Sequence, residues 1–397
     1  MKRRDFLRNT SLASSLFFVP SFVKAFEKIA TENLGYKRLV IIQLSGGNDG
    51  LNTVIPFRND IYYAQRSSIA IQKNEIITLN DQLGLHQSLA PLKRLYDKGF
   101  VSIINNVGYP NPNRSHFRST DIWQTASDAD VYSHSGWIGR YLDLYGKKPY
   151  NVIEVDDNLS LALKGETNNG IATKNAQLLF QTSQDPYFKK VLKYYKDDHL
   201  NEHNLGYLYK TMIAAESSAT YIYETSRTFK SKQEYPQNPF AKQLKTTAEF
   251  INSGLDTSVF YTSLGGFDTH VNQQNKQKKL LQVYAESIES FVNDLQRNNT
   301  FKDTLILTFS EFGRRVQQNA ANGTDHGTAN NVFIIGENLK QKGVYNNAPN
   351  LSTLDENGDL IFEIDFRSIY ATILDKWLQV NDTSILNNKS FSKLDFI

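Results

Sequence analysis

The stretch TLILTFSEFGRRVQQNAANGTDHGTAN, residues 304–330, contains the pattern that decides the fold. It opens with an apolar run, Leu305 to Phe309, which is rich in β-forming residues and predicts a strand buried on both faces. Glu311 follows this strand, and Asp325 and His326 lie in a glycine-containing loop before a second apolar run. Open α/β sheets bind their ligands just beyond the carboxyl ends of parallel strands. The stretch therefore predicts a largely parallel sheet with polar groups gathered at one edge.

Other predicted strands also end in polar residues. The strand at 37–44 is followed by GGND (46–49), the strand at 258–264 by GGFDTH (265–270), and the strand at 100–105 by a proline-rich loop and the helix-starting sequence SHFR (115–118). Two consecutive glycines allow a sharp turn and a close backbone approach. Doubly wound sheets bring the carboxyl ends of their parallel strands into one crevice. We therefore expect Asp49, Asp268 and Glu311 to lie near one another.

The acids and histidines at these strand ends predict a metal centre. Three carboxylates and two imidazoles in one crevice repel one another unless they are protonated or neutralised by cations. The chain has no cysteine, so every ligand must be histidine or carboxylate. Two histidines with an aspartate suit Zn²⁺ or Mn²⁺, and a carboxylate-rich neighbouring site suits Mg²⁺, Mn²⁺ or Ca²⁺. We expect two divalent ions, and the candidate ligands are Asp49, Asp268, His270, Glu311, Asp325 and His326.

Ser115 and Arg118 are the candidate catalytic residues. Ser115 lies at the N-terminus of a predicted helix, where unpaired N–H groups and the helix dipole favour an anion. Arg118 lies one turn further along the same face, where its guanidinium could hold a tetrahedral oxyanion. The structural alternative is that Ser115 is an N-cap only and that Asp49 caps a turn or a helix.

Residues 1–25 have the features of a twin-arginine export signal. Arg3 and Arg4 precede a short apolar core at 12–19, and small residues at 23–25 offer a cleavage site. No apolar run reaches the ~20 residues that span a bilayer. The net charge is +3, with basic and acidic residues interspersed, so no surface for nucleic acid is expected. We predict a periplasmic or secreted protein that does not span the membrane.

Residues 36–397 are long enough for one large α/β domain with an insertion, which we predict, or for two domains. Polar helical patterns at 185–197 and 205–230 make the segment 150–250 a largely helical insertion, which we expect at the rim of the sheet as a lid or a partner surface. A further helix is predicted over 83–98.

The order of the motifs GGNDG, NRSHF, GGFDTH, SEFGR and GTDHG resembles the DUF1501 family, exported bacterial proteins placed in the alkaline phosphatase/sulfatase-like superfamily. The resemblance covers nearly all of the chain after the signal. It implies an alkaline phosphatase-like, three-layer α/β/α sandwich with a bimetal site. By this likeness Asp268, His270 and His326 hold the first ion, Asp49 and Glu311 bind the second, and Ser115 is the nucleophile.

Two positions depart from the patterns of that superfamily. Alkaline phosphatases have Asp-His where this chain has Glu311-Phe312, so the second ion loses an imidazole that His116 or Asp325 would have to replace. Sulfatases have proline two residues and arginine four residues after the residue that becomes formylglycine. Phe117 and Ser119 stand at these places, so formylglycine chemistry is not expected.

These features predict an exported, metal-dependent hydrolase of phosphate or related esters, sulfate esters included. The substrate would be a small-molecule or glycan ester. The first alternative is a non-catalytic metal-binding scaffold or a polysaccharide-handling partner protein, because a fold does not determine a function. The second alternative is a metal-dependent transferase.

Overall fold

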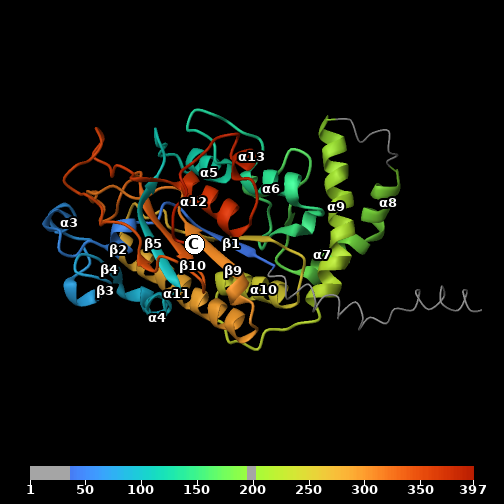
Figure 1. Ribbon diagram of the computed structural model, residues 1–397, viewed down its shortest axis with the longest axis horizontal. Coiled ribbons are helices and arrows are strands. Elements are labelled where there is room, and N and C mark those ends of the chain that lie inside the picture. Colours follow the sequence, from blue (N-terminus) through green and yellow to red (C-terminus); the bar gives the residue numbers. More distant parts are fainter. Residues whose placement is uncertain (1–35, 195–202) are drawn as a thin grey trace, which may run out of the picture. The chain divides into compact units, whose positions relative to one another are not determined.

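A nine-stranded sheet runs through the part of the chain that the computed structural model describes, residues 36–194 and 203–397. Its strands are β1 (Arg38–Ser45), β5 (Val101–Gly108), β6 (Val152–Glu154), β7 (Ile171–Ala172), β8 (Val259–Gly265), β9 (Thr304–Phe309), β10 (Asn330–Ile335), β11 (Gly343–Val344) and β12 (Ile364–Asp365). Their order is β11-β5-β10-β9-β1-β8-β6-β7, with β12 beside β5. Figure 1 labels the strands β5, β10, β9 and β1 of this sheet. Among these described strands only β10 runs antiparallel to its neighbours. The predicted export signal at 1–25 lies outside the described residues.

Helices cover both faces of this sheet. The described helices are α3 (Asp60–Gln65), α4 (Ala90–Asp97), α5 (His116–Thr125), α6 (Trp137–Tyr145), α7 (Ala176–Gln184), α8 (Pro186–Tyr194), α9 (His203–Ser226), α10 (Pro239–Asn252), α11 (Gln273–Arg297), α12 (Phe366–Thr372) and α13 (Asp382–Ile385), and among them α4, α5, α6, α10, α11 and α12 pack on the sheet. Leu39 and Ile41 of β1 pack in one core with α5, α6 and α12, whereas Val40 and Ile42 pack in a second core with α4, α10 and α11. Successive side chains of a strand point to opposite faces. The predicted three-layer α/β/α sandwich is therefore confirmed.

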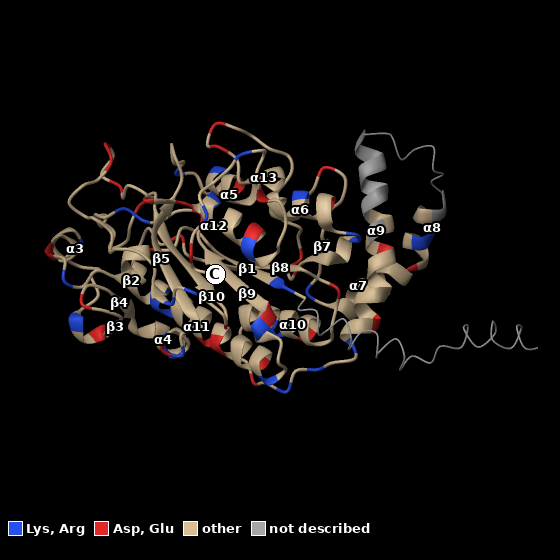
Figure 2. Ribbon diagram, in the orientation of Figure 1, with Lys and Arg blue, Asp and Glu red and all other residues tan. Residues whose placement is uncertain are grey.

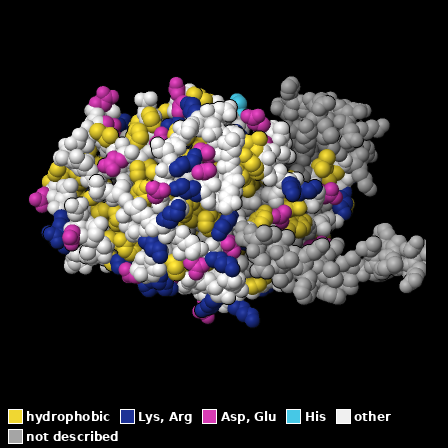
Figure 3. Space-filling model, in the orientation of Figure 1, with side chains coloured by type: hydrophobic (Ala, Val, Ile, Leu, Met, Phe, Trp, Pro, Cys, Tyr) yellow, Lys and Arg dark blue, Asp and Glu magenta, His cyan; other side chains and the backbone are white. Residues whose placement is uncertain are grey.

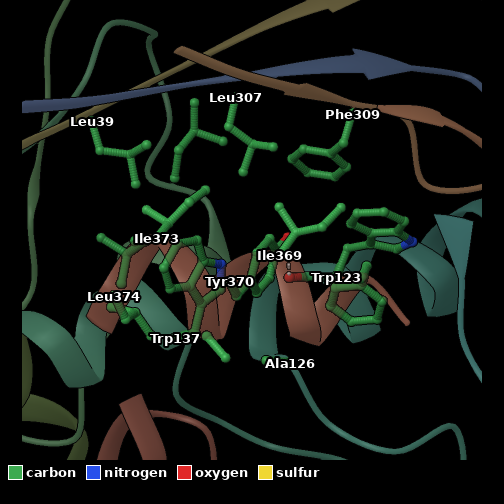
Figure 4. Close-up of a cluster of buried hydrophobic side chains, with 14 of the residues drawn as sticks. Leu39, Trp123, Ala126, Trp137, Leu307, Phe309, Ile369, Tyr370, Ile373 and Leu374 are labelled. Carbon is green, nitrogen blue, oxygen red and sulfur yellow. Dashed lines mark hydrogen bonds between the residues drawn. The ribbon is translucent and has the colours of Figure 1, made fainter. Parts of the chain in front are cut away.

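An aromatic stack joins α5 and α12 to the sheet (Figure 4). The ring of Trp123 in α5 stacks on Phe309 of β9, with ring centroids 4.7 Å apart, and on Phe366 of α12 at 4.3 Å. Trp137 of α6 stacks on Tyr370 of α12 at 4.2 Å. Stacked aromatic pairs contribute about 0.5–1.5 kcal/mol beyond the area they bury. The stack holds α5, and therefore the N-terminus of that helix, against the end of β9.

The segment 150–250 was predicted to be a largely helical lid or partner surface at the rim of the sheet. It contributes β6 and β7 to the sheet and then the helices α7 to α10. Tyr221 of α9 packs on the ring of Tyr150, with centroids 4.2 Å apart, and its hydroxyl accepts a hydrogen bond from the backbone N–H of Asp256 at 3.0 Å. Tyr150 and Asp256 precede β6 and β8, so α9 packs at the amino ends of these strands. This position of α9 does not fit a lid over the carboxyl ends of the strands, and the alternative of a partner surface stays a prediction.

A second, three-stranded sheet forms from β2 (Val54–Ile55), β3 (Ile76–Thr78) and β4 (Gly84–His86). The predicted helix at 83–98 therefore begins only at Ala90. The first residues of that pattern pair with β2 and β3, because their apolar side chains also satisfy a buried strand.

Charges are mixed over the surface. Basic and acidic residues are interspersed among the elements and over the face drawn in space-filling form (Figures 2 and 3). Within the described ranges, no helix has both the length and the apolar character needed to cross a bilayer.

Candidate metal centre

The loops after β1 and β8 lie directly against each other. Gly46 has a φ of +117°, and a Cβ atom there would lie 2.4 Å from the backbone nitrogen of Asp268. Only glycine permits this approach. Arg314, whose side chain is fully buried, joins the two loops by donating to the carbonyl oxygens of Gly46 and Gly47 and to Oδ1 of Asp268, at 2.5, 2.7 and 2.8 Å. Asp268 is thereby fixed at the carboxyl ends of β1 and β8.

Three histidines next to Asp268 are each held through Nδ1. The Nδ1 contacts are His116 with Oε1 of Glu311 at 2.9 Å, His270 with Oδ1 of Asp325 at 3.1 Å, and His326 with the carbonyl oxygen of Arg114 at 2.6 Å. Carboxylate and carbonyl oxygens only accept hydrogen bonds, so Nδ1 is the donor in all three rings. A neutral imidazole with its hydrogen on Nδ1 keeps a lone pair on Nε2. Such oxygen partners orient histidine ligands in metal sites.

The three Nε2 atoms converge on Asp268. Oδ1 of Asp268 lies 3.0 Å from Nε2 of His270 and 3.5 Å from Nε2 of both His116 and His326. The Nε2 atoms of His270 and His326 are 2.9 Å apart. Ligand atoms around a tetrahedral Zn²⁺ lie about 3.3 Å apart, given bonds of about 2.0–2.1 Å. Two lone pairs at 2.9 Å repel unless a cation lies between them. The donor set fits Zn²⁺ or Mn²⁺.

A second observation supports this fit. Nε2 of His116 is buried and has no hydrogen-bond partner among the described residues. Most buried polar groups in proteins have a hydrogen-bond partner, and a bound ion would supply one for this nitrogen. His116, Asp268 and His326 form a group in which all the candidate ligand atoms lie within 4.8 Å of one another.

The surroundings of the centre shift the pKa values of Asp268, His116 and His326 in different directions. Burial works to raise the pKa of Asp268, but the hydrogen bond and charge of Arg314, together with His270 and His116, lower it to about 2. The hydrogen bond to Glu311 raises the pKa of His116. Burial lowers the pKa of His326 and therefore favours its neutral, ligating form.

Glu311 and Asp325 lie behind the histidines. The carboxylate of Glu311 is buried, accepts a hydrogen bond from the N–H of Gly46 at 2.8 Å, and orients His116. Asp325 is half exposed and orients His270. The structure therefore brings both predicted residues to the centre as partners of histidine rings.

Asp49 is held away from these histidines. Its Oδ1 accepts hydrogen bonds from the N–H groups of Leu51 and Asn52, which begin a 3₁₀ helix, and its Oδ2 pairs with Arg66 at 2.6 Å. The side-chain amide of Gln273 donates to the same Oδ2 through Nε2. These are the contacts of the structural alternative, in which Asp49 is a cap.

Ser115 and Arg118 have different surroundings in the structure. Ser115 is exposed at the N-terminus of α5, and its side chain makes no capping hydrogen bond. Arg118 is buried, donates to the carbonyl oxygens of the loop at 128–131, and lies 3.9 Å over the ring of Tyr132. Its guanidinium is used to hold that loop.

Three residues of this arrangement were missed as partners from the sequence. His116 was considered only as a substitute ligand, although it directly follows Ser115 in the NRSHF motif. Arg314 follows Glu311 in the SEFGRR motif, and a long, positively charged side chain at that position could have been predicted to pair with a nearby carboxylate. Arg66 lies in no motif, and nothing in the sequence connects it with Asp49.

Comparison with known proteins agrees with the motifs. Residues 36–385 match the family described as "Protein of unknown function (DUF1501)". No curated protein matches.

Similar solved structures include three that share 10–12% sequence identity with the chain. A protein of the alkaline phosphatase superfamily from Vibrio parahaemolyticus has a TM-score of 0.42 at 10% identity, with 91% of this chain and 72% of that chain covered. A sulfatase from Pseudoalteromonas sp. has a TM-score of 0.39 at 12% identity, covering 94% and 73%. The C-terminal periplasmic domain of EcEptC from Escherichia coli has a TM-score of 0.38 at 10% identity, covering 76% and 72%. Similarity at this level carries no argument about chemistry.

Proposed function

The chain belongs to the DUF1501 family, whose description assigns no activity, and from the geometry of its centre we propose that it is a metal-dependent hydrolase of phosphate or sulfate esters. One observation carries the proposal: Nε2 of His116, His270 and His326 all lie 3.0–3.5 Å from Oδ1 of Asp268. The twin-arginine pattern at 1–25 supports a reaction outside the cytoplasm.

We propose that His116, Asp268, His270 and His326 hold one Zn²⁺ or Mn²⁺ ion. When bound, the ion would act as a Lewis acid on an oxygen of the ester. The two ions expected from the sequence are revised to one, because the carboxylate of Asp49 is already balanced by Arg66. Arg314 supplies a second fixed positive charge, 2.8 Å from Asp268.

Ser115 is the proposed nucleophile. Its neighbours in the chain both contact the centre, since the carbonyl of Arg114 accepts from His326 and the ring of His116 faces Asp268. The unpaired N–H groups of the first turn of α5 favour a negatively charged group at this position. The guanidinium of Arg114 pairs with the carboxylates of Asp359 and Asp355, so it does not take over the role of nearby cation that was predicted for Arg118.

The test is turnover of p-nitrophenyl phosphate and p-nitrophenyl sulfate by the full chain with Zn²⁺, Mn²⁺, Mg²⁺ or Ca²⁺ supplied in turn. We expect activity with Zn²⁺ or Mn²⁺ and its loss in Ser115→Ala. Because the Ser115 side chain makes no capping hydrogen bond, the variant should keep its free energy of unfolding within about 0.5 kcal/mol and also its metal content. Ser115→Gly is the matched control for backbone effects. Undiminished turnover in both variants would refute the nucleophile.

The pairing of Asp49 with Arg66 favours a second candidate, a non-catalytic scaffold that keeps a single metal ion. This reading predicts one bound ion and no turnover of a broad panel of phosphate and sulfate esters. Turnover that depends on the added ion and on Ser115 excludes it.

A further inference from the structure

Asp359 is a buried acidic residue outside the proposed ligand set. Its side chain is 0% exposed, and it lies at the end of a turn that begins at Asp355. The turn is closed without its carboxylate. The N–H group of Asp359 donates to Oδ1 of Asp355 at 2.8 Å, and the N–H group of Asp355 donates to the carbonyl oxygen of Asp359 at 2.9 Å. The carboxylate of Asp359 is therefore free to hold other parts of the chain.

This carboxylate joins two arginines from different loops. Its Oδ2 accepts hydrogen bonds from Nε of Arg114, at 2.7 Å, and from Nη2 of the same guanidinium. Its Oδ1 accepts from Nε of Arg315 at 3.2 Å. Burying a carboxylate is costly unless cations and hydrogen bonds compensate it. Asp359 therefore fixes where these two guanidinium groups lie.

Both arginines also contact the segment that contains His326. The carbonyl oxygen of Arg114 accepts the hydrogen bond from Nδ1 of His326 at 2.6 Å. The N–H group of Arg315 donates to the carbonyl oxygen of Asp325, the residue before His326, at 3.1 Å. The acceptor at Nδ1 sets which ring nitrogen has the hydrogen, and Nε2 then keeps its lone pair for a ligand. The ring of His326 and the backbone beside it are thus held by two residues whose side chains meet at Asp359.

We propose that Asp359 is a positioning residue of the metal centre and acts on His326 through Arg114. The carboxylate fixes the guanidinium of Arg114, and the backbone carbonyl of the same residue then lies where it accepts from the ring of His326. The inference rests on the proposed function for the presence of an ion. The orientation of the ring is a property of the protein without metal. The structural alternative is that Asp359 is a buried ion pair that only supports its loop.

The first experiment examines the metal-free full chain at a pH at which His326 is neutral. NMR spectra of ¹⁵N-labelled histidine distinguish the two neutral tautomers, and the signals that disappear in His326→Gln belong to His326. We expect the parent to have the hydrogen on Nδ1 only. In Asp359→Ala the tautomer with the hydrogen on Nε2 should appear beside it, because the acceptor is no longer held in place. Arg114→Leu, which keeps the backbone carbonyl and removes the guanidinium, should give the same change.

The second experiment measures Zn²⁺ affinity by competition with a chromophoric chelator. Asp359→Ala and Arg114→Leu should each bind Zn²⁺ about tenfold more weakly, at the low end for residues that orient a ligand. The double variant should lose no more than either single variant, because both substitutions remove the same contact. Asp359→Asn keeps the shape and one acceptor oxygen, so it should recover part of the affinity.

Asp294→Ala is the matched control for stability. Asp294 is also buried, and its carboxylate accepts from the hydroxyl groups of Ser231 and Tyr235. It lies near the C-terminus of α11, whereas the N-terminus of that helix follows His270 in the chain. Asp294→Ala should lower the urea midpoint of unfolding and leave both the ring signals of His326 and the Zn²⁺ affinity unchanged.

The outcomes separate the role of Asp359 from the proposed function. A lower urea midpoint in Asp359→Ala with unchanged His326 signals overturns the positioning role and leaves a supporting ion pair. Additive losses of Zn²⁺ affinity in the double variant overturn the action through Arg114. A parent that binds no Zn²⁺ overturns the metal centre, and the tautomer of His326 still decides whether Asp359 orients the ring. If Asp359→Ala does not fold, Arg114→Leu replaces a side chain that is 36% exposed, and unchanged His326 signals in that variant overturn the proposal.

Discussion

Asp49 and Asp268 follow the same local pattern, a pair of glycines at the end of a parallel strand, and β1 and β8 are direct neighbours in the sheet. Their surroundings are nevertheless opposite. The side chain of Asp49 is 0% exposed, whereas that of Asp268 is 49% exposed. Asp49 pairs with Arg66 and starts a 3₁₀ helix, while Asp268 faces three histidines and Arg314.

The difference lies in which cation each carboxylate meets. The guanidinium of Arg66, at the end of α3, neutralises Asp49. Together with the other hydrogen-bond donors around this carboxylate, it leaves no lone pair free for a ligand. Asp268 is surrounded by imidazole nitrogens that have lone pairs of their own. A strand-end carboxylate therefore becomes part of a scaffold or part of a binding centre according to residues distant in the sequence.

Arg66→Leu should break the scaffold side of this comparison most strongly. It would leave the carboxylate of Asp49 buried and unpaired, which costs about 3–5 kcal/mol of unfolding free energy. Urea denaturation measures the loss. The control is Arg94→Leu, which removes an exposed pair with Glu289 and should cost less than about 1 kcal/mol. Equal losses in the two variants would show that the Asp49 pair is not a special support.

Glu154, at the end of β6 beside β8, extends the comparison to a carboxyl group that pairs with neither an arginine nor a histidine among the described residues. Burial raises the pKa of Glu154 from 4.5 to about 7. Its added stability is therefore present below pH 4.5 and is lost as the pH rises through 7, by about 3 kcal/mol at most. Glu154→Gln does not titrate, so its stability relative to the parent should increase between pH 5 and pH 8. A difference that stays constant over this range would contradict the prediction.

Asp268→Asn should break the binding side. We expect at least a ~100-fold loss of Zn²⁺ affinity, measured by competition with a chromophoric chelator, because a charged ligand is lost. The free energy of unfolding without metal should change little, since asparagine can still accept from Arg314. Asp49→Asn is the matched control and should show the reverse pair of effects. Loss of Zn²⁺ affinity in Asp49→Asn would place that residue in the metal centre.

Glu311→Gln and Asp325→Asn should give the smallest effects and sharpen the comparison within the centre. Both carboxylates orient a histidine, but Glu311 is 1% exposed and Asp325 is 54% exposed. We expect about tenfold weaker Zn²⁺ binding in Glu311→Gln, at the low end for such partners, because the amide oxygen still accepts from His116. Water can replace the contact of Asp325, so its variant should lose less. The opposite order would show that His270 depends more on its partner than His116 does.

Much of the fold and part of the centre follow from local patterns. The strands predicted at 37–44, 258–264 and 305–309 correspond to β1, β8 and β9 within one residue at each end, because a buried parallel strand needs an uninterrupted apolar run. The convergence of Asp268, His270 and His326 follows from the position of glycine turns at strand ends. By contrast, residues 84–86 at the start of the helix predicted at 83–98 also fit a strand, and only their pairing with β2 and β3 decided between the two.

The amino-acid sequence by itself determined the layers of this protein, which of its strands end in polar residues, and which chemical groups are available at the crevice. These features depend on periodicity and turn chemistry, which act over a few residues. Only the tertiary structure decided that Asp49 is a cap, that Arg118 holds a loop and that His116 joins the centre. Whether a charged side chain binds a ligand or supports the scaffold depends on the partner that neutralises it, and here those partners come from distant parts of the chain.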